Sequence, residues 1–388
     1  MNRSRIAHSA ELVRRAWLLV GGTLVALMVI ELASSLVLNV FRAQPDEADA
    51  RARADAYAGA TWTDAYFSEF TESGHVRWEP YVYWRRPPYT GKYINVDADG
   101  FRRTWIPEHP TTMTIFMFGG STMWGTGARD DFTIPSLVAK QLSTRGISAR
   151  VVNFGESGYV STQELIALER ALQQGARPDA VVFYDGVNDP FPAMQMGVAG
   201  IPQNEFNRRR EFNILDPTRR ADLLAEVFTG PLSPRQTATY RLASALIRRV
   251  GLGKAAGQSS AGAASSLSPS VVADVVRIYR ANVRSVEALA TAYGFQAAFY
   301  LQPAVFSKQR LTDYERARLN EVAADVPAYL RVYDAIRSDG DLSTDPRFHD
   351  LSDIFGSDGR PYFIDAWHLS EDGNAVIAGR MLTDVQRP

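Results

Sequence analysis

Apolar and polar positions alternate in long blocks from about residue 112 to the end of the chain. Four short apolar runs span 114–118, 151–154, 180–184 and 295–301, and helical patterns of apolar positions fall at 134–141, 162–173 and 271–293. Continuous apolar strands that alternate with helices are typical of a parallel sheet covered on both faces. We therefore predict a doubly wound α/β fold, with a fifth strand at 330–333 and a last helix near the C-terminus.

The N-terminal pattern is different, because residues 16–41 are almost entirely apolar and carry Glu31 as their one charge. About 20 apolar residues suffice to cross a bilayer. The preceding residues 1–15 are basic, and the basic flank of a span stays in the cytoplasm. We predict that 16–41 is an uncleaved transmembrane anchor of a single-pass protein, that 1–15 is cytoplasmic, and that the rest is extracytoplasmic, as in a bacterial periplasm. A cleaved signal peptide and a buried core helix are the alternatives.

Two further segments interrupt the α/β rhythm. Residues 42–110 form a polar tether followed by an aromatic-rich stretch, 62–105, whose rings either cover the core or stack on sugars. Residues 190–270 form an insertion with predicted helices at 219–228 and 240–250 and a Gly/Ala/Ser-rich tract at 253–270. The main domain is thus expected at 111–388.

Composition removes several classes of function. The 42 basic and 43 acidic residues nearly cancel, so the chain lacks the basic field that nucleic-acid binding requires. There is no Cys, which excludes disulfides, thiolate metal sites and a Cys nucleophile. The five His show no paired-helix spacing, and the Gly119–Ser121 turn lacks the Lys of a phosphate loop. We expect no metal and no cofactor.

The candidate chemistry follows the apolar runs, because ligands bind at the carboxyl ends of parallel strands. Ser121 follows the first run after two glycines. A serine nucleophile needs a base and a third group that orients this base. Among the five His, only His368 has an aspartate three residues before it, Asp365; His75 has Glu72 at the same spacing but lies in a polar, loop-like stretch. We predict that Ser121, His368 and Asp365 form a triad.

An acyl-transfer site also needs donors aimed at the developing oxyanion. Three strand ends offer one each: the backbone N–H of Ser121, the backbone N–H of Gly158, and the side-chain amide of Asn188. We predict these three groups as the oxyanion hole.

In this order of blocks the chain resembles the SGNH (GDSL-type) hydrolase family. The blocks are FGGSTMWG at 118–125, VVNFGESGY at 151–159, YDGVND at 184–189 and DAWHLSEDG at 365–373. The resemblance implies a flavodoxin-like α/β/α sandwich of about five parallel strands. It also implies Ser121 as nucleophile, His368 as base, Asp365 as its orienting acid, and Ser121, Gly158 and Asn188 as oxyanion donors. One departure is Gly120, where the family often has Asp.

The function expected from these residues is that of a serine esterase that forms an acyl-Ser121 intermediate. By analogy with anchored relatives, its substrates would be O-acetyl esters on cell-surface carbohydrate. Two alternatives stay open at this point. One is an O-acetyltransferase, which discharges the same intermediate onto an extracytoplasmic sugar. The other is a non-catalytic SGNH-fold module that binds carbohydrate through the 62–105 aromatics.

Overall fold

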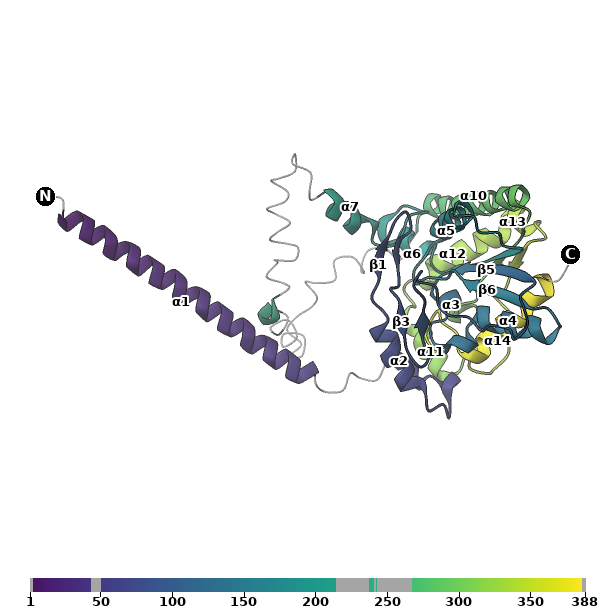
Figure 1. Cartoon of the computed structure of the whole chain (residues 1–388), viewed down its shortest axis with the longest axis horizontal. Coiled ribbons are helices and arrows are strands. Elements are labelled where there is room, and N and C mark those ends of the chain that lie inside the picture. The colour runs from purple at the N-terminus through teal and green to yellow at the C-terminus, as the bar shows by residue number, and fades with distance from the viewer. Residues whose placement is uncertain (1–2, 43–49, 214–236, 241, 243–266, 386–388) are drawn as a thin grey trace. The chain divides into compact units, whose positions relative to one another are not determined.

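The computed structural model describes residues 3–42, 50–213, 237–240, 242 and 267–385 (Figure 1). Two compact units make up the chain. One consists of residues 48–206 and 260–388, and the other of residues 1–47 and 207–259.

A five-stranded sheet forms the centre of the first unit. Its order is β6-β5-β7-β8-β9, and each neighbouring pair is parallel. The strands are β5 (Met113–Gly119), β6 (Ala149–Asn153), β7 (Ala180–Asp185), β8 (Gln296–Leu301) and β9 (Phe348–Asp350). Counted along the chain this order is 2-1-3-4-5, the flavodoxin-like arrangement. The predicted doubly wound α/β fold with five parallel strands is confirmed.

Helices cover both faces of this sheet, because neighbouring side chains of each strand point to opposite sides. Phe116, Phe118 and Phe183 lie in the core under α5 (Ser161–Gln173), α10 (Pro269–Tyr293) and α12 (Val326–Ser338). On the other face, Ile115, Met117 and Val182 lie under α4 (Ile134–Thr144) and α14 (Glu371–Val385). Three of these helices match the predicted 134–141, 162–173 and 271–293, and α14 is the predicted last helix.

The prediction of a strand at 330–333 was wrong. These residues belong to α12, where Tyr329, Val332, Tyr333 and Ile336 are buried. Their spacing of three and four is that of one helix face. The fifth strand is β9, which contains only three residues, two of them His349 and Asp350. Its sequence therefore gave no apolar run from which to predict it.

The segment before the sheet packs on the same unit. It contains the 3₁₀ helices η1 (Ala50–Arg53) and η2 (Asp55–Tyr57), the helix α2 (Thr63–Glu72), and two antiparallel pairs, β1 (Arg77–Glu79) with β2 (Tyr83–Arg85) and β3 (Tyr89–Thr90) with β4 (Asn95–Val96). Most aromatic side chains here are buried or half-buried, whereas Trp78 and Tyr81 are exposed. Covering the core is thus the main role of this segment.

The short elements lie mainly between strands and helices. They are α3 (Ser121–Trp124), η3 (Asp130–Phe132), α6 (Pro190–Met196), α7 (Glu205–Asn213), η6 (Val305–Ser307), α11 (Asp313–Glu321) and α13 (Gly340–Ser343). The predicted helix at 219–228, most of that at 240–250 and most of the tract at 253–270 lie outside the described residues.

The N-terminal helix α1 runs over Arg3–Arg42. Its stretch Arg14–Val37 is long and apolar enough to cross a membrane, its most apolar 18-residue window has no buried residue, and most of its large apolar side chains are exposed. This exposure argues against a buried core helix. A membrane span and a signal sequence both fit a helix of this length and composition.

Candidate active site

Three neighbouring strands deliver the predicted residues to one edge of the sheet. Ser121 begins α3, two residues after β5 ends. Gly158 follows β6, and Asn188 follows β7. Strands β6 and β7 lie on either side of β5. The site is therefore at the carboxyl ends of the strands, beside the point where the strand order reverses, which is where this sheet type binds ligands.

The structure brings Ser121, His368 and Asp365 together in a chain of hydrogen bonds. The distance from His368 Nε2 to Ser121 Oγ is 2.7 Å, although 247 positions separate the two residues. The distance from His368 Nδ1 to Asp365 Oδ2 is also 2.7 Å. Because the carboxylate accepts from Nδ1–H, Nε2 is left as the lone-pair nitrogen that faces the serine hydroxyl.

The loop that carries Asp365 and His368 is held in a tight turn. The N–H of Ile364 donates to the carbonyl of His368 at 3.0 Å. Asp365 Oδ1 accepts the N–H groups of Trp367 and His368 at 2.9 and 2.8 Å. One oxygen of the carboxylate thus fixes the loop, and the other orients the imidazole.

Electrostatics keep Asp365 in its charged form. Partial burial by itself would raise the pKa of this carboxyl. The charge and hydrogen bond of His368, together with the two N–H groups, outweigh burial and lower the pKa of Asp365 to about 2. Arg51 Nη1 lies 3.7 Å from Asp365 Oδ2 and adds a positive charge. The acid therefore stays an anion throughout the pH range in which a histidine base can work.

Asn188 lies directly over the residue before the nucleophile. A Cβ atom built on Gly120 would be 1.9 Å from Asn188 Nδ2, far inside van der Waals contact. Any side chain at position 120 would displace the amide, which accounts for Gly in place of the Asp that is common in the resembling family. The amide nitrogen is thereby held beside the N-terminus of α3, at the nucleophile.

The three predicted oxyanion donors are available for a ligand. Across the described part of the chain, no acceptor is found for the N–H of Ser121, the N–H of Gly158 or the side-chain amide of Asn188. Gly158 has a φ of +76°, a left-handed conformation that favours glycine. A Cβ here would also be 2.3 Å from Gln203 Nε2.

A buried ion pair supports the loop that carries Gly158. Glu156 is fully buried, and its carboxylate accepts the N–H of Arg86 at 3.0 Å and that of Ser157 at 2.8 Å. Burial raises the pKa of Glu156, an effect that the nearby charge of Arg86 partly offsets. Arg86 also donates to Ser157 Oγ at 3.2 Å. Glu156 thus anchors the loop that carries Gly158.

Buried carboxyls also hold the loop of Asn188. Asp189 accepts from Ser161 Oγ at 2.6 Å and from the Ser161 N–H at 3.2 Å, which ties this loop to the start of α5. Asp185 and Glu164 are buried beside it. Burial raises the pKa of Glu164, and the neighbouring Asp185 raises it further. Burial and the neighbouring Asp185 thus both favour the protonated form of Glu164 over its carboxylate.

Within the residues that the structure describes, no group of three or more His, Asp or Glu side chains could hold a metal ion.

The site residues that the sequence did not predict are Arg51 and Arg86. Both come from the segment before the sheet, and neither belongs to a motif, so only the folded chain shows that they reach the site.

No known protein-family model matches the sequence, and no curated protein is significantly similar to it. Solved structures that are similar include an acetyl xylan esterase, at 14% identity and a TM-score of 0.38 over 70% of this chain and 100% of that one. A lipolytic protein of the G-D-S-L family from Veillonella parvula is similar at 10% identity and a TM-score of 0.37, over 71% of this chain and 100% of that one. An acetylxylan esterase from Geobacillus stearothermophilus is similar at 14% identity and a TM-score of 0.31, over 72% and 96%. Likenesses this low carry no weight for the chemistry of this chain, which has to be argued from its own residues.

Proposed function

We propose that this protein is a serine esterase that cleaves carboxylic esters through an acyl-Ser121 intermediate. The observation that carries the proposal is the continuous contact from Asp365 through His368 to Ser121, with 2.7 Å at both steps. These distances are within the range of a base that takes a proton from a nucleophile.

In the first half-reaction Ser121 Oγ attacks the ester carbonyl carbon, and His368 Nε2 takes the hydroxyl proton. The negative charge that develops on the carbonyl oxygen is met by the free donors of Ser121, Gly158 and Asn188. When the tetrahedral intermediate collapses, the C–O bond to the alcohol breaks and His368 returns the proton to the leaving oxygen.

In the second half-reaction a water molecule gives its proton to His368 and attacks the acyl carbon. Collapse of the second intermediate returns the proton to Ser121 Oγ and releases the carboxylic acid. Asp365 stays ionised in both halves, since its depressed pKa leaves it without a proton to exchange.

We extend the proposal to O-acetyl esters of cell-surface carbohydrate, because the motif order resembles anchored SGNH hydrolases. The N-terminal helix supports this placement, since the large apolar side chains of Arg14–Val37 are mostly exposed. The basic end of this helix favours the cytoplasmic side, because it carries Arg3, Arg5, Arg14 and Arg15. The esterase unit would then be outside the cytoplasm.

The test uses the full-length protein in detergent micelles. We expect a fluorophosphonate probe to label Ser121 and p-nitrophenyl acetate to be hydrolysed. The Ser121→Ala variant should lose both signals. Ser285→Ala is the matched control, because Ser285 is an exposed serine on α10, and it should behave like the wild type.

Wild-type activity equal to that of Ser121→Ala, with no labelling of the folded protein, would reject the esterase and favour a non-catalytic module. Addition of acetylated and unacetylated oligosaccharides separates the remaining alternative. Free acetate as the sole product supports the esterase, whereas transfer of the acetyl group to an added sugar, detected by mass spectrometry, supports the acetyltransferase.

A further inference from the structure

A pocket lies on the first unit, away from Ser121. It has a volume of about 670 Å³ and is lined by β1, β2, the segment 97–101, the first half of β5, the length of β6 and the end of α5. Thr114 and Arg150, near the start of their strands, mark its position. Ser121 follows the other end of β5, where Gly119 is about 16 Å along the strand from Thr114 and about 10 Å from Phe116 at a rise of about 3.3 Å per residue.

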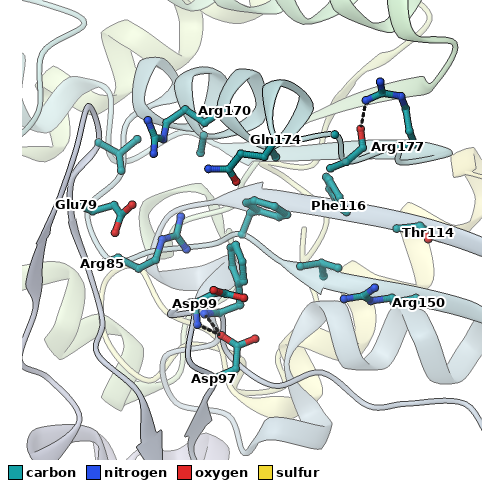
Figure 2. Close-up of a pocket in the computed structure, with 18 of the residues that line it drawn as sticks. Glu79, Arg85, Asp97, Asp99, Thr114, Phe116, Arg150, Arg170, Gln174 and Arg177 are labelled. Carbon is teal, nitrogen blue, oxygen red and sulfur yellow. Dashed lines mark hydrogen bonds between the residues drawn. The ribbon is translucent and has the colours of Figure 1, made fainter.

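The pocket is rich in arginine. Five of its lining residues are arginines and three are carboxylates, and Figure 2 shows the side chains of Glu79, Arg85 and Gln174 around one space. The arginines are Arg77, Arg85, Arg150, Arg170 and Arg177. No ion pair joins any of them to a carboxylate of the pocket in the described part of the chain.

Arg85 is the central feature. Its side chain is only 5% exposed, and its buried Nη1 atom has no hydrogen-bond partner among the described residues. The guanidinium stacks on the Phe101 ring, with 4.7 Å from Cζ to the ring centroid. The next residue, Arg86, points to the other side of the chain and supports the Ser157 loop. A buried guanidinium without an acceptor is costly, and a bound anion would remove that cost.

The other lining residues restrict the class of anion. Phe101, Phe116 and Phe154 supply an apolar aromatic wall, which suits the carbon face of a ring. Glu79 and Asp99 are acceptors and would repel a compact, multiply charged anion such as phosphate, but they accept hydroxyl protons well. The ligand that satisfies all three features is a ring that carries one carboxylate and several hydroxyl groups.

We propose that this pocket binds a uronic acid residue of an acidic polysaccharide. The Arg85 guanidinium holds the carboxylate, with the neighbouring arginines adding attraction. The aromatic wall contacts the sugar ring, and Glu79, Asp99 and Gln174 bind its hydroxyls. The pocket would tether the polymer at a point distant from the nucleophile. This proposal does not depend on the esterase activity, because it concerns binding alone.

The experiment measures binding to full-length protein in neutral detergent by isothermal titration calorimetry. The probe is a trimer of galacturonic acid. The comparison ligands are a neutral xylose trimer and inorganic phosphate. The variants are Arg85→Met, which keeps the apolar stem over Phe101, and Arg150→Gln, which changes an exposed residue and leaves folding intact. Arg331→Gln, an exposed arginine on α12, is the matched control.

We expect the uronate trimer to bind the wild type and Arg331→Gln equally. Arg85→Met should bind it at least tenfold more weakly, the cost of losing a charge-assisted hydrogen bond. Arg150→Gln should weaken it by a smaller factor that shrinks at high salt. The thermal melting midpoint reports whether each variant is folded, and if Arg85→Met is unfolded, Arg150→Gln decides.

Four results would overturn the proposal. They are no binding of the uronate, equal binding of the neutral trimer, equal binding of phosphate, and uronate affinity unchanged in every folded pocket variant. Hydrolysis of p-nitrophenyl acetate should not change in any of these variants. A loss of uronate binding with hydrolysis intact therefore concerns this pocket, whereas an inactive wild type concerns the proposed esterase.

Discussion

Substitution of Gly120 by Ala tests the arrangement of the nucleophile and Asn188 most directly. The new methyl group would be 1.9 Å from Asn188 Nδ2 and 3.1 Å from its Cγ. Carbon and nitrogen atoms in contact are normally separated by about 3.5 Å or more. The amide must therefore move by roughly 1.5 Å or rotate away, whereas Ser121, His368 and Asp365 keep their own contacts.

The size of the effect follows from the role of the displaced group. Loss of one oxyanion donor lowers kcat by about 10² to 10³, or about 3–4 kcal/mol of transition-state stabilisation. Displacing one half-buried amide should cost the fold less, about 1 kcal/mol. Gly120→Ala should thus remain folded, keep its reactivity with a fluorophosphonate in weakened form, and lose most of its turnover.

The assay is steady-state hydrolysis of p-nitrophenyl acetate by the wild type, Gly120→Ala, Asn188→Ala and the double variant. If both changes remove the same donor, their effects do not add, and the double variant should be no slower than the slower single variant. Gly340→Ala is the control, because a Cβ at position 340 meets nothing within 4 Å. Wild-type kcat in Gly120→Ala, or fully multiplicative losses in the double variant, would refute this reasoning.

Three further predictions concern the groups behind the site. Asp365→Asn should lower kcat by about 10⁴ with little change in KM, because the imidazole loses the partner that fixes its tautomer; a loss below tenfold in the same assay would contradict this. The folded-state pKa of Asp365, about 2, is below the ordinary value, so its ionised form stabilises the fold above pH 4 by about 2 kcal/mol, and this contribution is lost as pH falls toward 2. Urea unfolding of the wild type and Asp365→Asn at pH 7 and pH 3 should show their stability difference shrinking at the lower pH. The opposite sign holds for Glu164, whose raised pKa destabilises the fold progressively as pH rises above about 4. Glu164→Gln should therefore gain stability relative to the wild type between pH 5 and pH 8, and a constant difference would argue against a buried neutral acid.

Local sequence patterns were sufficient to predict four of the five strands and the site residues that lie in sequence motifs. Long apolar runs identify β5, β6, β7 and β8, and topological rules bring their carboxyl ends together. The pattern failed at β9, since a three-residue edge strand with a polar half has no periodic signal. The helix at 330–333 was also not predicted. Over only four residues, Leu-Arg-Val-Tyr is compatible with both the helical period of 3.6 residues and the strand period of 2.

The arginines that support other site residues could not be predicted, because neither belongs to a recognisable sequence motif. Arg51 reaches Asp365 across more than 300 positions, and Arg86 reaches Glu156 across 70. Gly120 was visible only as a departure from a familiar block. The reason for glycine at position 120 is the close packing of Asn188 against it. Gly120 follows β5 and Asn188 follows β7, so this contact exists only in the folded chain and neither sequence segment shows it.

The loop after Ser121 shows why residues before position 111 cannot be separated from the unit that carries the sheet. The carbonyl of Gly127 accepts from Tyr57 Oη, and its N–H donates to Tyr66 Oη at 2.9 Å. Arg102, almost completely buried, donates to the carbonyls of Gly125 at 2.7 Å and Ala128 at 2.6 Å. Buried backbone groups that lose their partners cost about 1–3 kcal/mol each, so this loop cannot keep its conformation without the earlier segment. A boundary at 111 would cut through these bonds, and the compact unit accordingly begins at residue 48.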